Sequence, residues 1–311
     1  MNLDALITRF LGDLQIRNYS PRTVQEYGLC LGVFGRFLER CAITDIQTLT
    51  TATLTEFQRW LYYQPTRQGT ARGAGDQNRT LAAIKSFFRF LKNEGILVRD
   101  PAEAVEYAHQ PQTLPRNVLT PQEARRVLEK VDTTTILGYR DRTILEVFYA
   151  TGIRRGELCQ LQIQDAALEE GLLRINGCKG AKERVVPLGR IACQFLETYL
   201  KGVRPLLLKA GASERLFLSF RGKPLIPDAV RRLVARHAKL AGVKKHMTCH
   251  VWRHTCATHL LKNNANLRHV QEMLGHRSLA TTERYLRLTI ADLKEAHHKF
   301  HPREKGVASE R

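Results

Sequence analysis

The sequence predicts a mainly α-helical protein of two domains, with one small antiparallel β-sheet in the second domain. Three observations support this fold class. The chain has 311 residues, whereas a single domain typically holds about 100–200. Apolar residues recur at helical spacing along most of the chain. Two short strand-like runs, separated by a glycine-containing turn, interrupt that periodicity in the second half.

Amphipathic runs predict a helical first domain over residues 1–108. The second helix is expected to begin at Ser20-Pro21, because serine caps helix N-termini and proline fits the first helical turn. The segment 64–77, which contains glycines and arginines, suits either a solvated loop or a loop that contacts phosphates. The apolar stripes are Leu3, Leu6, Ile7, Phe10 and Leu14; Val24, Tyr27, Leu31, Phe34 and Leu38; Leu54, Phe57 and Leu61; and Leu81, Ile84, Phe87, Phe88 and Leu91.

A polar stretch at 109–115 is expected to link the domains, because Pro111 and Pro115 favour an extended backbone. The second domain is then expected at 116–300, and a polar tail follows at 301–311.

The positive charge is divided unevenly between the two parts. Residues 1–112 carry a net charge of +2 and residues 113–311 carry +17, out of +19 for the whole chain. Such an excess favours a polyanionic partner, either nucleic acid or an anionic membrane surface. The second domain should therefore provide most of the attraction.

Strands are expected at 172–176 and 184–187 in the second domain. The segment between them, 177–182, has glycines where a tight turn needs them. The rest of this domain is expected to be helical.

The composition also indicates a compartment. No apolar run approaches the roughly 18 residues that a membrane-spanning helix needs, and the first 13 residues lack the features of a secretion signal. The seven cysteines include no C-x-x-C pair, which is typical of reduced thiols. We therefore expect a cytoplasmic protein.

Three segments, at 151–158, 250–254 and 274–285, concentrate polar side chains more than a helical core requires. Each places charged or nucleophilic groups on one helical face or beside a helix end. The residues concerned are Arg154, Glu157, His250, Arg253, His276 and Tyr285.

A metal site is not expected, although His250 and His254 have the spacing of a zinc-protease helix. That motif places glutamate directly after the first histidine, where this chain has Val251. The cationic Arg253 would also oppose a dication. The turn 177–182 lacks the spacing of a phosphate-binding P-loop, so no nucleotide cofactor is expected either.

Arginine, histidine, lysine and tyrosine together suit phosphoryl transfer without a metal. Arginine forks stabilise the charge that develops on nonbridging phosphate oxygens. A tyrosine hydroxyl becomes a nucleophile when a neighbouring group accepts its proton. A lysine at a hairpin tip can protonate the leaving oxygen.

The same segments resemble those of the tyrosine recombinases, the family of phage integrases and Xer proteins, and the resemblance covers nearly the whole chain. T-G-I-R-R-G-E-L at 151–158 is similar to the family's first arginine box, and H-V-W-R-H at 250–254 to its second. G-C-K-G-A-K-E-R-V-V-P-L at 177–188 is similar to its lysine hairpin. L-G-H at 274–276, followed by Tyr285, matches the closing histidine and the nucleophile.

The resemblance implies a role for each residue. Tyr285 would attack a DNA phosphate to give a 3′-phosphotyrosyl link and a free 5′-hydroxyl, without metal or ATP. Lys179 would protonate the leaving oxygen, with Lys182 as the alternative because Cys178 lengthens the hairpin. Glu157 would orient its neighbours. The groups around the phosphate would be Arg154 and Arg253 as clamps, His250 in proton transfer and His276 as a hydrogen-bond donor.

The resemblance also implies partners. A helical SAM-like core-binding domain and a catalytic domain would close as a clamp on double-stranded DNA. The free chain would be a monomer or weak dimer. Four protomers, alone or with a second recombinase, would act on paired sites through a Holliday junction, with a helix at 289–300 docked into a neighbour. The expected DNA contacts are Arg22, Arg72, Arg79, Lys85, Lys182 and Arg184.

Two other functions remain open at this point. One is a recombinase-derived regulator that binds DNA without cutting it, and the other is a type IB topoisomerase. The favoured interpretation is an Xer-like enzyme for integration, excision or dimer resolution.

Overall fold

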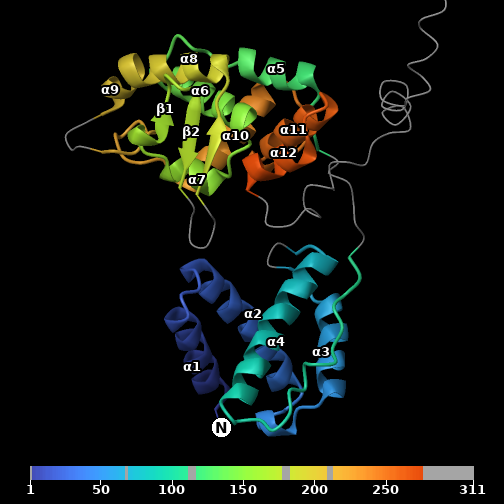
Figure 1. The fold of residues 1–311 in the computed structure, drawn as a ribbon. Coiled ribbons are helices and arrows are strands. Elements are labelled where there is room, and N and C mark those ends of the chain that lie inside the picture. Colours follow the sequence, from blue (N-terminus) through green and yellow to red (C-terminus); the bar gives the residue numbers. More distant parts are fainter. Residues whose placement is uncertain (1, 67–68, 111–116, 177–182, 209–212, 276–311) are drawn as a thin grey trace, which may run out of the picture. The chain divides into compact units, whose positions relative to one another are not determined.

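The protein divides into two compact units, Met1–Gln112 and Thr113–Arg311 (Figure 1). The predicted fold class, mainly helical with one small antiparallel sheet, is confirmed. The structure, a computed structural model, describes residues 2–66, 69–110, 117–176, 183–208 and 213–275.

The first unit is helical throughout its described residues. Ser20 begins its second helix as predicted: the Oγ atom accepts a hydrogen bond from the backbone N–H of Thr23 at 3.1 Å, and Pro21 occupies the first turn. The fourth helix begins inside the segment 64–77, which the sequence assigned wholly to a loop. The bounds are α1 (Leu3–Ile16), α2 (Pro21–Arg40), the short 3-10 turn η1 (Ile46–Thr48), α3 (Thr51–Tyr63) and α4 (Ala74–Asn93).

Phenylalanine rings fill the core of this unit. Phe10, Phe34, Phe57 and Phe87 are completely buried, and the rings of Phe34 and Phe57 meet edge to face with their centroids 5.1 Å apart. Every residue of the predicted apolar stripes belongs to this core or packs against it.

The second unit combines helices with the sheet. No helix in the described part of the chain has the length and apolarity needed to cross a lipid bilayer. The bounds are α5 (Pro121–Glu129), α6 (Ile136–Thr151), α7 (Arg155–Gln160), η2 (Ile163–Asp165), β1 (Ala166–Ala167), β2 (Leu172–Ile175), β3 (Arg184–Pro187), α8 (Arg190–Thr198), the π-helical turn η3 (Tyr199–Val203), α9 (Arg204–Leu207), α10 (Pro227–Leu240), α11 (Cys249–Lys262) and α12 (Leu267–Leu274).

The sheet is antiparallel in the order β1-β2-β3. Ile175 pairs with Arg184, and Leu173 pairs with Val186. Because Ile175, Leu173 and Val186 are completely buried, the alternation of a strand places Arg184 on the face that packs on the core. The two predicted strands are confirmed, whereas β1 is an Ala-Ala pair too short to show any periodicity.

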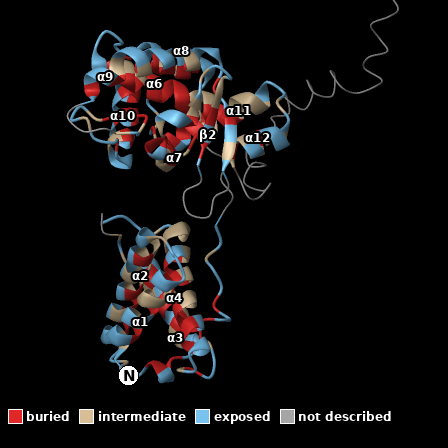
Figure 2. Ribbon diagram, turned by 60° about the vertical axis from the view of Figure 1, so that its left-hand side comes forward, coloured by how far each residue is buried: buried red, intermediate tan, exposed pale blue. Residues whose placement is uncertain are grey.

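Helix α6 runs through the core of the second unit. Figure 2 shows its buried residues in red, with β2 and α11 also contributing to the interior. Ile144, Leu145 and Phe148 of α6 are completely inaccessible, as is Trp252 of α11. Helix α11, which carries the second predicted arginine, packs directly against α6. The core thereby fixes the distance between the two predicted arginine segments.

Candidate active site

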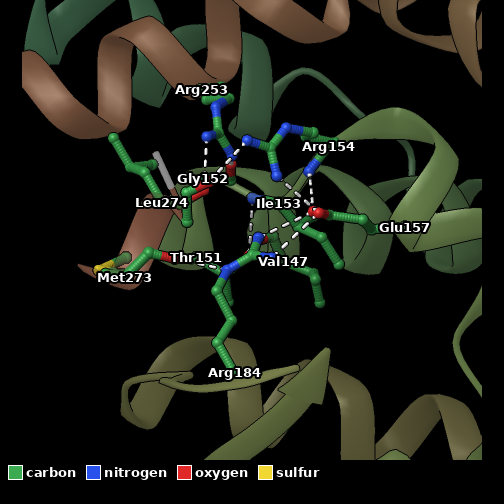
Figure 3. Close-up of polar contacts among 11 residues, drawn as sticks. Val147, Thr151, Gly152, Ile153, Arg154, Glu157, Arg184, Arg253, Met273 and Leu274 are labelled. Atoms are coloured by element: carbon green, nitrogen blue, oxygen red, sulfur yellow. Dashed lines mark hydrogen bonds and ion pairs between the residues drawn. The ribbon is translucent and has the colours of Figure 1, made fainter. Parts of the chain in front are cut away.

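The predicted arginine segments meet at the C-terminal end of α6. Figure 3 shows Arg154, Glu157, Arg184 and Arg253 around the turn at Gly152. They come from the start of α7, the start of β3 and the middle of α11. Residues that are 99 positions apart in the chain, Arg154 and Arg253, thus reach one site.

The turn at Gly152 sets the position of Arg154. Gly152 has φ +58°, and its N–H donates to the carbonyl of Phe148 at 3.0 Å, which ends α6 in a left-handed cap. A Cβ at this residue would lie 2.6 Å from Cδ2 of Leu274. Glycine is therefore required both by the backbone conformation and by the close approach of α12.

Glu157 is a buried carboxylate held by two arginines. It accepts from the backbone N–H and Nη1 of Arg154, both at 2.8 Å, and from Nη1 and Nη2 of Arg184 at 3.0 and 2.8 Å. Burial by itself would raise the pKa of Glu157, but the hydrogen bonds from Arg184 and Arg154 lower it to about 2. Glu157 is therefore ionised at neutral pH.

The C-terminal end of α12 is bound by three different arginines. Arg184 donates from Nε to the carbonyl of Met273 at 2.9 Å. Arg253 donates from Nη2 to the carbonyl of Leu274 at 2.5 Å, and Arg154 donates from Nη2 to the carbonyl of Gly275 at 2.9 Å. The last carbonyls of a helix have no intrahelical partners and lie at the negative end of its dipole. Three consecutive carbonyls here receive charge-assisted hydrogen bonds instead.

Arg253 is buried, and Arg154 is partly exposed. The Arg253 side chain also donates from Nη1 to the carbonyl of Gly152 at 2.8 Å. The Arg154 side chain keeps about a third of its surface accessible, at 35%. The site thus has a fixed inner guanidinium and a second guanidinium that faces solvent.

Two histidines of α11 lie beside the arginines. His250 is exposed, but partial desolvation and the charges of Arg253, Arg155 and Arg154 lower its pKa. Burial, followed by the charges of His250 and Arg253, lowers the pKa of His254 to about 4. Both rings are therefore neutral at pH 7, so the exposed His250 has a ring nitrogen that can accept a proton.

Several predicted residues lie outside the described part of the chain: Lys179, Lys182, His276, Tyr285 and the segment 289–300. Within the described ranges, no group of three or more His, Cys, Asp or Glu side chains is placed to hold a metal ion.

The predicted DNA contacts differ in their exposure. Arg22 and Arg79 are exposed, and Lys85 is partly exposed with Nζ 3.2 Å from the carbonyl of Glu103. Arg72 and Arg184 do not fit the expectation of free surface cations. The Arg72 side chain is only 12% accessible and is paired with Asp76.

Arg184 is only 9% accessible, and its donors go to Glu157 and to the carbonyl of Met273. The sequence of the hairpin indicated the charge of this residue but not its role. The spacing of Arg184 two residues before Val186 was the available signal, because strand alternation puts both residues on one face.

A helical first unit, together with a second unit that gathers arginines and histidines at one site, defines the tyrosine recombinase class. The model of the phage integrase family matches residues 117–291, and the model of the phage integrase N-terminal SAM-like domain matches residues 7–95. The chain therefore belongs to the phage integrase family and is a DNA-binding, tyrosine-type site-specific recombinase.

Named relatives agree over the full length. Tyrosine recombinase XerD of Staphylococcus saprophyticus is 36% identical over 302 residues, which cover 97% of this chain and 100% of that protein. Tyrosine recombinase XerD of Staphylococcus aureus is 35% identical with the same coverage.

Solved structures share the fold. The XerH recombinase bound to palindromic difH, a post-cleavage complex, is 25% identical with a TM-score of 0.74, covering 91% of this chain and 81% of that one. The lambda integrase tetramer bound to a Holliday junction is 20% identical with a TM-score of 0.70, covering 92% of this chain and 77% of that one.

Proposed function

We propose that this enzyme exchanges DNA strands at a specific double-stranded site through a 3′-phosphotyrosyl intermediate on Tyr285. The observation that carries the proposal is the joint placement of Arg154 and Arg253. Their guanidinium groups bind adjacent carbonyls of the same helix end. Two cations held side by side suit the two nonbridging oxygens of one phosphodiester.

The arginines stabilise the charge of the transition state. A guanidinium has five N–H donors, and the side chain of Arg154 donates to Glu157 and to Gly275 while remaining partly exposed. Donors are therefore left to bind a phosphate oxygen. Since Glu157 stays ionised and buried, it holds Arg154 at a defined position without competing solvent.

Proton transfer completes the reaction. The phenolic oxygen of Tyr285 forms a bond to phosphorus while the bond from phosphorus to the 5′ oxygen breaks. His250 assists removal of the tyrosine proton, His276 donates a hydrogen bond to the phosphate, and Lys179 protonates the leaving 5′ oxygen, with Lys182 as the alternative donor. The covalent link conserves the phosphodiester bond, so the 5′-hydroxyl of a second strand can reverse the step without ATP.

The full reaction requires an assembly on DNA. We assign residues 1–108 to a core-binding domain, 109–115 to a linker, 116–300 to the catalytic domain and 301–311 to a tail. Four protomers on two sites would exchange strands in pairs through a Holliday junction. The solved lambda integrase tetramer on such a junction has the same fold, which supports this part of the proposal.

Covalent trapping tests the proposed chemistry. The purified chain is incubated with DNA flanking its own gene, and protein–DNA adducts that survive SDS are mapped to a nucleotide. We expect one preferred site, a free 5′-hydroxyl, and loss of the adduct in Tyr285→Phe with DNA binding retained. An adduct that persists in Tyr285→Phe would overturn the assignment.

Two further outcomes would identify the alternative functions. Binding without any adduct would indicate a DNA-binding regulator. Relaxation of supercoiled plasmid independent of sequence would indicate a topoisomerase.

A further inference from the structure

We infer that Arg184 is a positioning residue for strand cleavage, which fixes Glu157 and the end of α12 and through them the phosphate-binding arginine Arg154. This inference rests on the proposed function. Arg184 itself need not touch DNA.

The side chain of Arg184 uses three nitrogen atoms in three directions of support. Nη1 and Nη2 form a fork on the two carboxylate oxygens of Glu157. Nε donates to the carbonyl of Met273 at 2.9 Å. A planar guanidinium can satisfy a carboxylate and a carbonyl at the same time, whereas a lysine ammonium lacks this fixed geometry. One side chain thus joins β3, α7 and α12.

Gly275 is packed on the same guanidinium. A Cβ at Gly275 would lie 3.2 Å from Cδ, Nε and Cζ of Arg184. Gly275 has φ +65° and ends α12 in a left-handed cap. Its carbonyl accepts from Arg154 at 2.9 Å. The residue directly before His276 is therefore held from two sides by Arg184 and Arg154.

Glu157 transmits the effect to the phosphate site. The carboxylate that receives the Arg184 fork also accepts from the backbone N–H and Nη1 of Arg154. If Arg184 were removed, Glu157 would keep a buried charge with half of its hydrogen-bond donors lost. Arg154 would then lose its fixed position, and a misplacement of about 1 Å can cost roughly 100-fold in rate.

A direct DNA contact does not account for this geometry. The side chain of Arg184 is 9% accessible and faces the core side of the sheet. On the opposite face of the same sheet, Arg174 is exposed and pairs with Val185. Arg174 is therefore the matched control: a cation of the same hairpin that has no part in the Glu157 network.

The test uses the full chain and a nicked DNA duplex carrying the mapped cleavage site. Single-turnover formation of the covalent adduct and the Kd for DNA are measured for wild type, Arg184→Met, Arg184→Lys, Arg174→Met, Glu157→Gln and the double variant. We expect Arg184→Met to slow cleavage about 10–100-fold with a Kd within about 3-fold of wild type. Arg184→Lys should recover part of the rate, and Arg174→Met should cleave at the wild-type rate.

Non-additivity provides the decisive readout, because a residue that acts through Glu157 has no further effect once Glu157 is altered. The double variant should be no more than about 3-fold slower than the slower single variant. Multiplied losses in the double variant, a loss of affinity as large as the loss of rate, or unchanged cleavage in Arg184→Met would each overturn the inference.

Two controls keep the result interpretable. If Arg184→Met fails to fold, Arg184→Lys decides: slower cleavage at unchanged affinity supports the inference, and wild-type cleavage overturns it. If the wild-type chain itself forms no adduct, the proposed function fails, which is a different result from normal cleavage by Arg184→Met.

Discussion

Gly152 and Leu274 lie in direct apposition: a Cβ on Gly152 would come within 2.6 Å of the Leu274 side chain. This contact joins the end of α6 to the end of α12, where Arg253 donates to the carbonyls of both residues. The arginine therefore has a fixed place only if the two helix ends stay together.

Substitution of Gly152 by alanine should separate those helix ends. Alanine disfavours φ +58°, and its methyl group would overlap Leu274, so we expect the free energy of unfolding to fall by about 2–4 kcal/mol and cleavage to fall with it. Urea unfolding of the full chain measures the first effect and adduct formation measures the second.

Gly156→Ala is the matched control for this prediction. Gly156 lies in α7 and has an ordinary helical φ, and the methyl group of an alanine there would meet no neighbouring side chain within 4 Å. It should keep or slightly raise stability. Equal losses in the two variants would show that the apposition of Gly152 and Leu274 is not the cause.

The sequence was sufficient to predict most elements, because their signals are local. The Ser20-Pro21 cap and the apolar stripes of the first unit depend on residues a few positions apart. The strands around the lysine hairpin were predicted with nearly their observed bounds, 172–175 and 184–187. The two-residue strand β1 escaped prediction because two alanines show no alternation.

The site was predictable only in part, because its partners are far apart in the chain. The side chains of Arg154 and Glu157 are close in sequence and form an ion pair as neighbours on one helix turn. The bonds of Arg184 to Glu157 and Met273 span 27 and 89 residues. No local pattern encodes such contacts, so charge alone suggested a DNA contact for Arg184.

Acid should remove the contribution of Glu157 to stability. Its pKa is about 2 in the folded chain against an ordinary 4.5, so the stabilisation is fully present above about pH 5 and is lost as the pH falls towards 2. We expect Glu157→Gln to reduce the free energy of unfolding at pH 7 on the order of 2 kcal/mol, allowing for solvent screening. The difference from wild type should shrink as the pH approaches 3.

Tryptophan fluorescence can isolate this effect to the second unit. The chain has two tryptophans, Trp60 in the first unit and the completely buried Trp252 in the second. In a Trp60→Phe background, Trp252 is the single reporter. A difference in stability between wild type and Glu157→Gln that stays constant from pH 7 to pH 3 would contradict the prediction.

The rate of cleavage should also depend on pH through His250. Burial of part of the ring and nearby arginines lower its pKa below 6.5, so the neutral, proton-accepting form prevails at pH 7 and is lost at lower pH. We expect single-turnover cleavage to be flat around pH 7–8 and to decline in acid. His250→Asn should cleave about 100-fold more slowly and lose that decline.

An exposed histidine on the next helix serves as the control for that profile. His269→Asn, on α12, should leave the pH dependence unchanged. If His250→Asn keeps the wild-type acid limb, another group controls it and His250 has no part in proton transfer.

The salt dependence of DNA binding should reside mainly in the second unit. Residues 113–311 carry +17 of the net charge and residues 1–112 carry +2, and each unit has its own hydrophobic core. The slope of log Kd against log salt concentration grows by about 0.9 for each phosphate neutralised. Binding of the two fragments to one duplex, measured from low to moderate salt, should therefore give a shallow slope for 1–112 and a steep slope for 113–311. The near-neutral unit would then bind through a few placed side chains such as Arg22 and Arg79, whose substitution by methionine should lower affinity with little change in slope. A steeper slope for 1–112 than for 113–311 would show that local placement, and not net charge, governs the attraction to DNA.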